Sequence, residues 1–299
     1  MNEPRPDAIL IAGPTASGKT GLAVETALRV GGEIINTDSM QVYPSLPTLT
    51  AQPSMDERQG VPHHMFGHAP LNEPYSVARW HTDAKLAFED VRSRDRVPVF
   101  VGGTGLYFKA MLEGLAPVPT IDPQIREEVR QRSLIGGSAA MHGELETVDP
   151  DTAATVRPTD TQRICRALEV KLSTGRSLLD FRKEAKRDPL LTKHSVQSTV
   201  LMPDRAILHE RIEARAVTML ENGALDEVKA IIRLNLPADA TVMRAIGVPQ
   251  ITAFLNGEIG KVELLQRLQA ATRQYAKRQS TFFRGQFGND WVFRDPHKS

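Results

Sequence analysis

The sequence of 299 residues predicts an α/β fold, in which a parallel sheet core with helices on both faces is interrupted by a mostly helical insertion domain. Three observations predict this fold. The apolar run 8–12 ends in a glycine-rich turn that opens a helix, as a βα unit does. Short apolar runs alternate with helical patterns as far as residue 115, whereas residues 116–194 are helical in pattern and poor in strands. We therefore assign residues 1–115 and 195–299 to the core and 116–194 to the insertion.

The first part of the core is predicted from short buried runs and one clear amphipathic helix. That helix has apolar residues at helical spacing, at Val77, Trp80, Ala84, Phe88 and Val91. Prolines are frequent between residues 44 and 62, which indicates a loop without helices. The expected strands are 8–12, 33–37 and 98–101, and the expected helices are 21–30 and 75–94.

The insertion and the second part of the core follow from the same patterns. In the insertion, helical patterns are clearest at 125–133 and 160–174. An apolar run of strand type then returns at 196–202. It is followed by three further helical patterns, at 209–221, 226–234 and 263–283. We expect these last helices to pack on the core.

The composition is that of an ordinary globular enzyme. Hydrophobic residues make up 40% and charged residues 24%, and no apolar run is long enough to span a membrane. The N-terminus is unlike a signal peptide, and the single cysteine, Cys165, rules out an internal disulfide or a multi-cysteine zinc site. We therefore expect a cytoplasmic protein that does not bind membranes. We also expect it to act as a monomer. The net charge of +1 divides into −3 over residues 1–115 and +4 over the remainder, which suits a polyanionic partner but also solvated helix faces.

The residues after the first strand form the motif G-x-x-x-x-G-K-[ST], which binds linked phosphates. It comprises Gly13, Pro14, Thr15, Ala16, Ser17, Gly18, Lys19 and Thr20. The glycines let successive backbone N–H groups point inward, and Lys19 supplies positive charge to the outermost phosphate. The Thr20 hydroxyl is a natural ligand for Mg²⁺, which is the cofactor that we expect. Because a strand precedes the motif and a helix follows it, the sheet core is of the P-loop type.

An acidic residue, Asp38, follows the second expected strand, at the sheet edge where the phosphate loop also lies. Nucleotide hydrolases usually have an acid after another apolar strand, to complete the Mg²⁺ shell. Here that strand, 98–101, ends in Gly102, Gly103 and Thr104. The loop therefore does not decide whether phosphate is transferred, hydrolysed or released. A small-molecule or nucleoside kinase stays open, as does an RNA-binding protein whose loop is a nucleotide switch.

Nine segments carry a resemblance to a known family. They are GPTASGKT (13–20), DSMQVY (38–43), PHHMFG (62–67), YSVARW (75–80), VGGTGLY (101–107), QRICRALEV (162–170), ENGALDEV (221–228), RAIG (244–247) and AKRQSTFFR (276–284). In these segments, and in their order, nearly the whole chain resembles bacterial tRNA dimethylallyltransferases, also called tRNA isopentenylpyrophosphate transferases. The resemblance implies transfer of the dimethylallyl group from dimethylallyl diphosphate to N6 of adenosine 37, in tRNAs that read codons beginning with U. It would explain the missing acid, because no phosphoryl group is transferred.

The resemblance also implies roles for individual residues. Asp38 is expected to be the general base that accepts a proton from N6, and Thr104 is expected near the reacting centre. Arg244 resembles an arginine that adds charge near the diphosphate. The implied tRNA contacts are Asp38, Ser39, Met40, Gln41 and Thr104 at the site, and Arg126, Gln162, Arg163, Ile164, Cys165 and Arg166 on an insertion that grips the anticodon stem-loop. The amide of Gln41 suits a bidentate contact with an adenine edge. In one departure, Gln52 stands where the family commonly has a basic residue.

Overall fold

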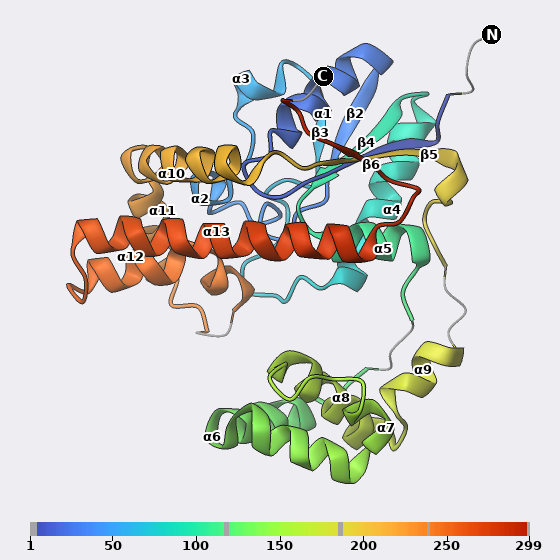
Figure 1. Ribbon diagram of the computed structural model, residues 1–299, viewed down its shortest axis with the longest axis vertical. Helices are drawn as coiled ribbons and strands as arrows, with labels where there is room; N and C mark the ends of the chain where they lie inside the picture. The colour runs from blue at the N-terminus through green and yellow to red at the C-terminus, as the bar shows by residue number, and fades with distance from the viewer. Residues whose placement is uncertain (1–4, 117–119, 185–187, 238–239, 298–299) are drawn as a thin grey trace. The chain divides into compact units, whose positions relative to one another are not determined.

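The computed structural model describes residues 5–116, 120–184, 188–237 and 240–297. The chain divides into two compact units, which Figure 1 shows as ribbons. One unit comprises Met1–Leu112 with Leu190–Ser299, and the other is the intervening segment Glu113–Pro189. The insertion predicted from the sequence, 116–194, begins and ends a few residues later than this second unit.

A parallel sheet forms the centre of the first unit, which confirms the predicted α/β fold. In the described part of the chain its six strands have the order β3 (His63–His64), β2 (Gly32–Asn36), β4 (Val97–Gly102), β1 (Ala8–Ala12), β5 (Val196–Leu201) and β6 (Val292–Arg294). β1 lies at the middle, with Ile11 opposite Val101 of β4 and Thr199 of β5. All the pairings are parallel, so the carboxyl ends of the strands meet at one edge, where ligands bind in sheets of this kind.

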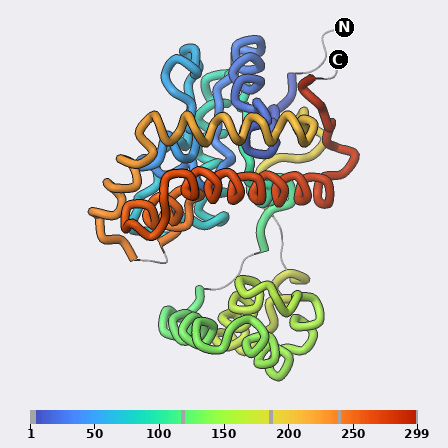
Figure 2. Tube along the Cα trace, turned by 60° about the vertical axis from the view of Figure 1, so that its left-hand side comes forward, coloured from blue at the N-terminus to red at the C-terminus, as the bar shows by residue number. Residues whose placement is uncertain are grey.

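Helices surround this sheet, and α10 and α13 run side by side in Figures 1 and 2. The helices of the unit are α1 (Lys19–Val30), α2 (Pro47–Thr50), α3 (Met55–Arg58), α4 (Val77–Ser93), α5 (Gly105–Glu113), α10 (Arg205–Glu221), α11 (Ala224–Arg233), α12 (Val248–Leu255) and α13 (Lys261–Gln286), with the 3₁₀ turns η1 (Lys193–Ser195) and η2 (Thr241–Arg244). Within the described ranges, no helix has the length and apolar character that crossing a membrane requires.

The sheet has a separate apolar cluster on each face because side chains alternate along a strand. Ile9 and Ile11 of β1 belong to the cluster under α1, together with Val24. Leu10 belongs to the opposite cluster, which includes Trp80 of α4. Each fully buried side chain of this size contributes roughly 1.5–3 kcal/mol to folding, so both faces stabilise the sheet. The predicted arrangement with helices on both faces is therefore confirmed.

The region between residues 44 and 62 contains two short helices that the sequence analysis did not predict. Pro47 starts α2, a position at which the missing N–H has no intrahelical partner to lose. Ser54 caps α3, since its hydroxyl accepts the N–H of Glu57 while the Glu57 carboxylate accepts the N–H of Ser54. The sequence analysis also did not predict the short strands β3 and β6. Elements of two to four residues are too short to show a periodic pattern of apolar residues.

The second unit is helical, as the sequence predicts. Its helices are α6 (Pro123–Val148), α7 (Pro150–Ala153), α8 (Thr161–Thr174) and α9 (Leu178–Glu184). The core of the unit lies between α6 and α8, where Val129 and Leu145 pack with Ile164 and Leu168. Gly137, with φ 70°, interrupts α6 in a conformation that favours glycine. The predicted helix 125–133 is therefore only the first part of a longer, kinked helix.

Gly102 ends β4 at the point where the chain after β2 passes closest. The Thr37 N–H donates to Val101 O at 2.8 Å, and the Thr104 N–H donates to Thr37 O at 3.2 Å. A Cβ on Gly102 would lie 2.0 Å from that Thr37 oxygen, which is a backbone atom and has no side chain to rotate away. We expect Gly102→Ala to lower the free energy of unfolding by about 1–3 kcal/mol, as forced overpacking does, measured by urea unfolding.

Gly285→Ala is the matched control, because a Cβ on this residue of α13 meets nothing within 4 Å. Alanine suits a helix better than glycine, so we expect a change between zero and about 1 kcal/mol in the stabilising direction. Equal unfolding midpoints for the two variants would contradict the prediction for Gly102.

Candidate active site

The phosphate loop between β1 and α1 has the backbone shape of an anion-binding nest. Ala16 (φ 64°) and Gly18 (φ 89°) have a positive φ, whereas Ser17 between them and Lys19 after them do not. This alternation turns successive N–H groups toward one point. α1 begins at Lys19, and the first N–H groups of a helix have no partners within it. The amides of Lys19 and Thr20 are therefore placed to bind an anion.

Two amides of the loop are engaged within the protein. The Thr15 N–H donates to Oε1 of Gln279 at 2.9 Å, and the Ser17 N–H donates to the Pro14 carbonyl at 3.2 Å. Pro14 itself has no N–H. The buried Ser17 hydroxyl lies against Gly13, where a Cβ would be 2.6 Å from it. Residues 14–17 thus set the shape of the loop, and Lys19 and Thr20 offer the donors.

Lys19 is accompanied by two arginines of α10 that the sequence analysis did not identify. Nη2 of Arg215 donates a hydrogen bond to the Thr15 hydroxyl. Nη1 of Arg211 lies beside Gly18, 3.7 Å from the place where a Cβ would be. Both arginines line the pocket at the loop. Positive charge therefore approaches the loop from α1 and from α10.

The cations at the loop are poorly solvated. Burial lowers the pKa of Lys19 to about 8; the charge of Asp38 opposes this shift and that of Arg215 adds to it. Burial likewise lowers the pKa of Arg215. Cations that have lost solvation gain most from a bound anion, because the anion stabilises their charged forms. The electrostatics of the loop therefore favour a multiply charged anion such as a diphosphate.

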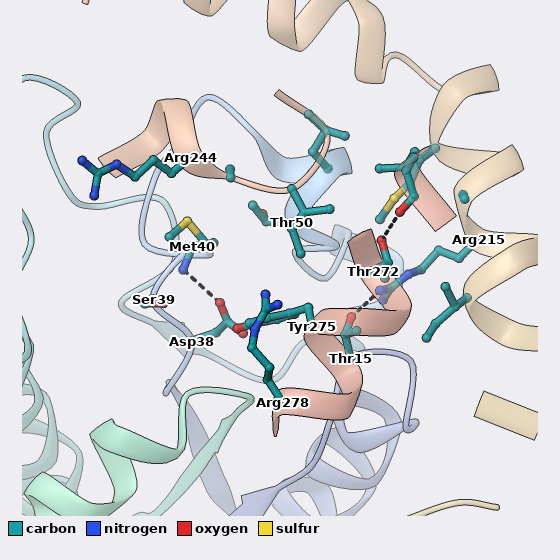
Figure 3. Close-up of a pocket in the computed structure, with 17 residues that line it drawn as sticks. Thr15, Asp38, Ser39, Met40, Thr50, Arg215, Arg244, Thr272, Tyr275 and Arg278 are labelled. Carbon is teal, nitrogen blue, oxygen red and sulfur yellow. Dashed lines mark hydrogen bonds between the residues drawn. The ribbon is translucent and has the colours of Figure 1, made fainter. Parts of the chain in front are cut away.

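Two pockets meet beside the loop. The phosphate pocket, of about 420 Å³, is lined by Thr15–Gly21 together with Asp38 and Arg215. The apolar pocket, of about 200 Å³, is drawn in Figure 3. Its lining includes the apolar residues Met40, Leu49, Ile212, Ala216, Met219, Ile246 and Leu268 and the polar residues Ser39, Arg244, Thr272, Tyr275 and Arg278. Thr15, Asp38, Thr50 and Arg215 line both pockets, so a carboxylate and a guanidinium stand at their junction.

Asp38 is held in place by the buried amide of Asn36, the last residue of β2. Nδ2 of Asn36 donates to the Asp38 carbonyl at 3.0 Å, and Oδ1 of Asn36 accepts the Asp38 N–H at 2.9 Å. Oδ1 of Asp38 accepts the N–H of Met40 at 2.9 Å, as the dashed line in Figure 3 shows. The carboxylate therefore has a fixed orientation at the pocket junction, near Tyr275.

Thr104 lies beside the segment that carries Asp38. Its hydroxyl accepts the Ser39 N–H at 2.9 Å and lies 3.3 Å from the Ser39 hydroxyl. Burial, with the nearby charge of Asp38, raises the pKa of Tyr275, so this ring is a neutral platform in the apolar pocket. The structure thus brings Asp38, Ser39, Met40 and Thr104 together, while their roles toward tRNA stay predictions.

Gln41 faces the phosphate pocket, but its side-chain amide is partly engaged. Nε2 donates to the carbonyls of Thr50 and Ala51, both at 2.9 Å. The donor side of the amide is thus used within the protein, and the bidentate contact with an adenine edge stays a prediction. Gln52 supports the same loop by donating to a backbone carbonyl at 2.8 Å. The carboxylate of Glu227, on α11, also holds α2, because it accepts the N–H groups of Thr48 and Leu49 at 2.6 and 3.0 Å.

Arg244 lines the apolar pocket and is not among the residues that line the phosphate pocket. Figure 3 shows it across the pocket from Thr15 and Arg215, with its guanidinium turned away from them. Its expected role near a diphosphate stays a prediction, because in this structure the side chain lies outside the phosphate pocket. The arginines that line the phosphate pocket are Arg211 and Arg215 of α10.

The predicted RNA contacts of the second unit lie on two helices. They are Arg126 on α6 and Gln162, Arg163, Ile164, Cys165 and Arg166 on α8. Gln162 and Arg163 are exposed, and Arg163 pairs with Asp160 at 3.3 Å. Arg126, Cys165 and Arg166 are half-buried. The side chain of Ile164 is fully buried in the core of the unit, and the contact of this segment with RNA stays a prediction.

Thr20 is the residue expected to bind Mg²⁺, and it lines the phosphate pocket next to Lys19. The described part of the chain has no group of three or more His, Cys, Asp or Glu side chains that could hold a metal ion. Mg²⁺ is often held by one or two protein oxygens together with substrate phosphates and waters. The residues therefore fit a magnesium ion that binds with a diphosphate, and they do not form a dedicated metal cage.

Comparison with known proteins gives consistent matches. The family model for IPP transferase matches residues 41–286, which spans both units. The tRNA dimethylallyltransferase of Rhizobium etli (strain CIAT 652) is 50% identical over 285 residues, covering 95% of this chain and 96% of the relative. That of Agrobacterium fabrum (strain C58) is 48% identical over 290 residues, covering 97% of each.

Solved structures agree with these matches. The tRNA isopentenylpyrophosphate transferase from Bacillus halodurans is 33% identical, with a TM-score of 0.68 over 96% of this chain and 89% of that one. A eukaryotic dimethylallyltransferase acting on tRNA is 28% identical, with a TM-score of 0.81 over 96% of this chain and 73% of that one.

Proposed function

Because this chain belongs to the IPP transferase family, we propose that it transfers the dimethylallyl group of dimethylallyl diphosphate to N6 of adenosine 37, in tRNAs that read codons beginning with U. The products are N6-isopentenyladenosine and diphosphate. The observation that carries the proposal is the junction of the two pockets, which Thr15, Asp38 and Arg215 share. A group transfer between two substrates needs such a junction, with a proton acceptor and a cation both in reach of the reacting atoms.

The two pockets suit the two substrates. The phosphate pocket would hold the diphosphate, because Lys19, Arg211 and Arg215 concentrate positive charge there. The apolar pocket would hold the adenine, which must leave its stack in the RNA to reach the enzyme. The ring of Tyr275 and the side chain of Met40 offer apolar surface to such a base.

The proposed reaction is a displacement at the allylic carbon. The N6 lone pair forms the new C–N bond while the allylic C–O bond breaks, and the bonding pair leaves with the diphosphate. The N6 proton passes to the carboxylate of Asp38. Charge that develops on the departing diphosphate is stabilised by Lys19, by Arg215 and by the first amides of α1. The hydroxyl of Thr104, beside Asp38, would orient the base.

Mg²⁺ would be held by the Thr20 hydroxyl and the diphosphate, and it would supply further charge stabilisation of the leaving group. We also propose that the insertion unit grips the anticodon stem-loop, with Arg126, Arg163 and Arg166 facing RNA phosphates. We expect the enzyme to act as a monomer in the cytoplasm. The single cysteine, Cys165, suits a reducing compartment.

A labelled-transfer assay tests the proposed function. The protein is incubated with dimethylallyl diphosphate, labelled in the allyl group, and an anticodon stem-loop transcript with adenosine at position 37. We expect label in this RNA, and none in the same transcript with guanosine at position 37, which lacks an N6 amine. We also expect label incorporation to fall when EDTA removes Mg²⁺.

The kinase interpretation is an outcome of the same experiment. ATP added with the transcript should not be consumed if the phosphate loop binds a leaving diphosphate. Failure to label the adenosine 37 transcript, with folded protein and Mg²⁺ present, would contradict the proposed function. ATP consumption that depends on a hydroxyl-bearing acceptor would then favour a kinase.

A further inference from the structure

The side chain of Gln279 joins the phosphate loop to the turn after β4. This residue of α13 is 6% exposed. Its Oε1 accepts the Thr15 N–H at 2.9 Å, and its Nε2 donates to Gly103 O at 2.9 Å. A single buried amide therefore bonds at one end to the loop that holds the leaving group and at the other end to the residue before Thr104.

The amide fits without spare room. A Cβ on Gly103 would lie 2.2 Å from Nε2 of Gln279 and 3.2 Å from Oδ2 of Asp38. Both side chains thus lie close to the same glycine. A residue with a Cβ at position 103 would prevent the Gln279 amide from reaching the Gly103 carbonyl in this arrangement. The link between loop and turn consequently passes beside the proposed base.

The connection continues from the turn to the base. The Thr104 hydroxyl accepts the Ser39 N–H, and Ser39 follows Asp38 directly. A shift of the phosphate loop relative to β4 would therefore change the distance between the leaving group and the base. Displacements of about 1 Å in reacting groups can lower the rate about 10²-fold, so a contact that fixes this distance would maintain the rate of transfer.

We propose that Gln279 is a positioning residue for prenyl transfer, which fixes the phosphate loop at a set distance from Asp38 and Thr104. The proposal rests on the proposed function, since it concerns the geometry of that reaction. Glutamine is suited to the position because the site needs one acceptor and one donor at the end of the same side chain. An ionised glutamate supplies only acceptors, whereas a protonated glutamate supplies one of each.

This chemistry provides a test with a pH readout. In Gln279→Glu, the protonated acid can accept the Thr15 N–H and donate to Gly103 O, but the carboxylate would face that carbonyl. Burial and the nearby charge of Asp38 both raise the pKa of a carboxyl group at this place, while Lys19 and Arg215 oppose that shift. The kcat of Gln279→Glu, divided by that of the parent protein at the same pH, should therefore fall as the pH rises from 5.5 to 8.5.

Gln279→Leu removes both hydrogen bonds at similar size. We expect its kcat to fall about 10²-fold, with little change in the affinity for the adenosine 37 stem-loop, measured by filter binding. Gln266→Leu is the control, because Gln266 is an exposed glutamine of the same helix. We expect it to keep the parent kcat.

The outcomes separate this proposal from the proposed function. A parent protein that does not transfer label fails the proposed function. If the parent transfers label, a Gln279→Leu enzyme with kcat within about threefold of the parent overturns the positioning role. The role is also overturned if Gln279→Glu loses the same fraction of kcat as Gln279→Leu at every pH. Should Gln279→Leu not fold, as judged by circular dichroism, the pH dependence of the kcat ratio for Gln279→Glu decides alone.

Discussion

Replacing Asp38 with asparagine is expected to lower kcat for prenyl transfer by about 10²- to 10⁴-fold, the range that a general base commonly contributes. The amide cannot take the N6 proton as the C–N bond forms. Its Oδ1 still accepts the Met40 N–H, so the loop should keep its shape. Affinity for the stem-loop should therefore change little. Single-turnover kinetics with saturating RNA, together with filter binding, measure the two effects separately.

Asp226→Asn is the matched control for this change. Asp226 lies on α11, is 80% exposed and pairs with Lys229. An exposed pair of this kind contributes little, so we expect parent activity. If Asp38→Asn kept more than about a tenth of the parent kcat, the general-base role would be refuted.

Replacing Lys19 with methionine is expected to lower kcat/KM for dimethylallyl diphosphate by about 10²- to 10³-fold, comparable with the loss of one donor from a site that stabilises developing charge. The parent enzyme should also show a pH effect at this residue. Burial places the Lys19 pKa at about 8 in the free protein, and diphosphate binds the protonated amine. The amine loses its proton as the pH rises through 8, so KM should rise above that pH, by at most about tenfold per pH unit.

Lys19→Arg separates charge from titration. An arginine stays protonated throughout this range, so the rise in KM above pH 8 should disappear even if activity is reduced. Lys229→Met, on the exposed pair of α11, should leave the parent pH profile unchanged. A parent KM that stays constant from pH 7 to 9 would refute the assignment of this titration to Lys19.

The sheet and the phosphate loop were predictable from the sequence because their signals are local. An apolar run, a fixed spacing of glycines and a lysine identify β1, the loop and the start of α1 within a dozen residues. Asp38 was predictable for a topological reason, since the ends of neighbouring parallel strands meet at one edge of the sheet. Its position at the pocket junction agrees with that argument.

The remaining parts of the site depend on contacts between distant segments. Arg211 and Arg215 are four residues apart and so share one face of a helix that follows β5, which was a usable signal. Gln279 gave no such signal, because only the packed structure shows that its amide reaches the loop. Arg244 was assigned by resemblance and the bidentate contact of Gln41 from the chemistry of its amide. Neither argument shows which way a guanidinium points or which carbonyl an amide already binds.

The link between Thr15 and Gln279 also bears on how the protein is made. The two residues are 264 positions apart, so the phosphate loop leaves the ribosome long before its partner is synthesised. Folding of a chain during synthesis proceeds from the N-terminus, and contacts between distant residues form late and slowly. Until α13 has been released and packed, the nascent chain contains the loop without the residue that sets its place. Catalytic competence should therefore be among the last properties that a newly made molecule acquires.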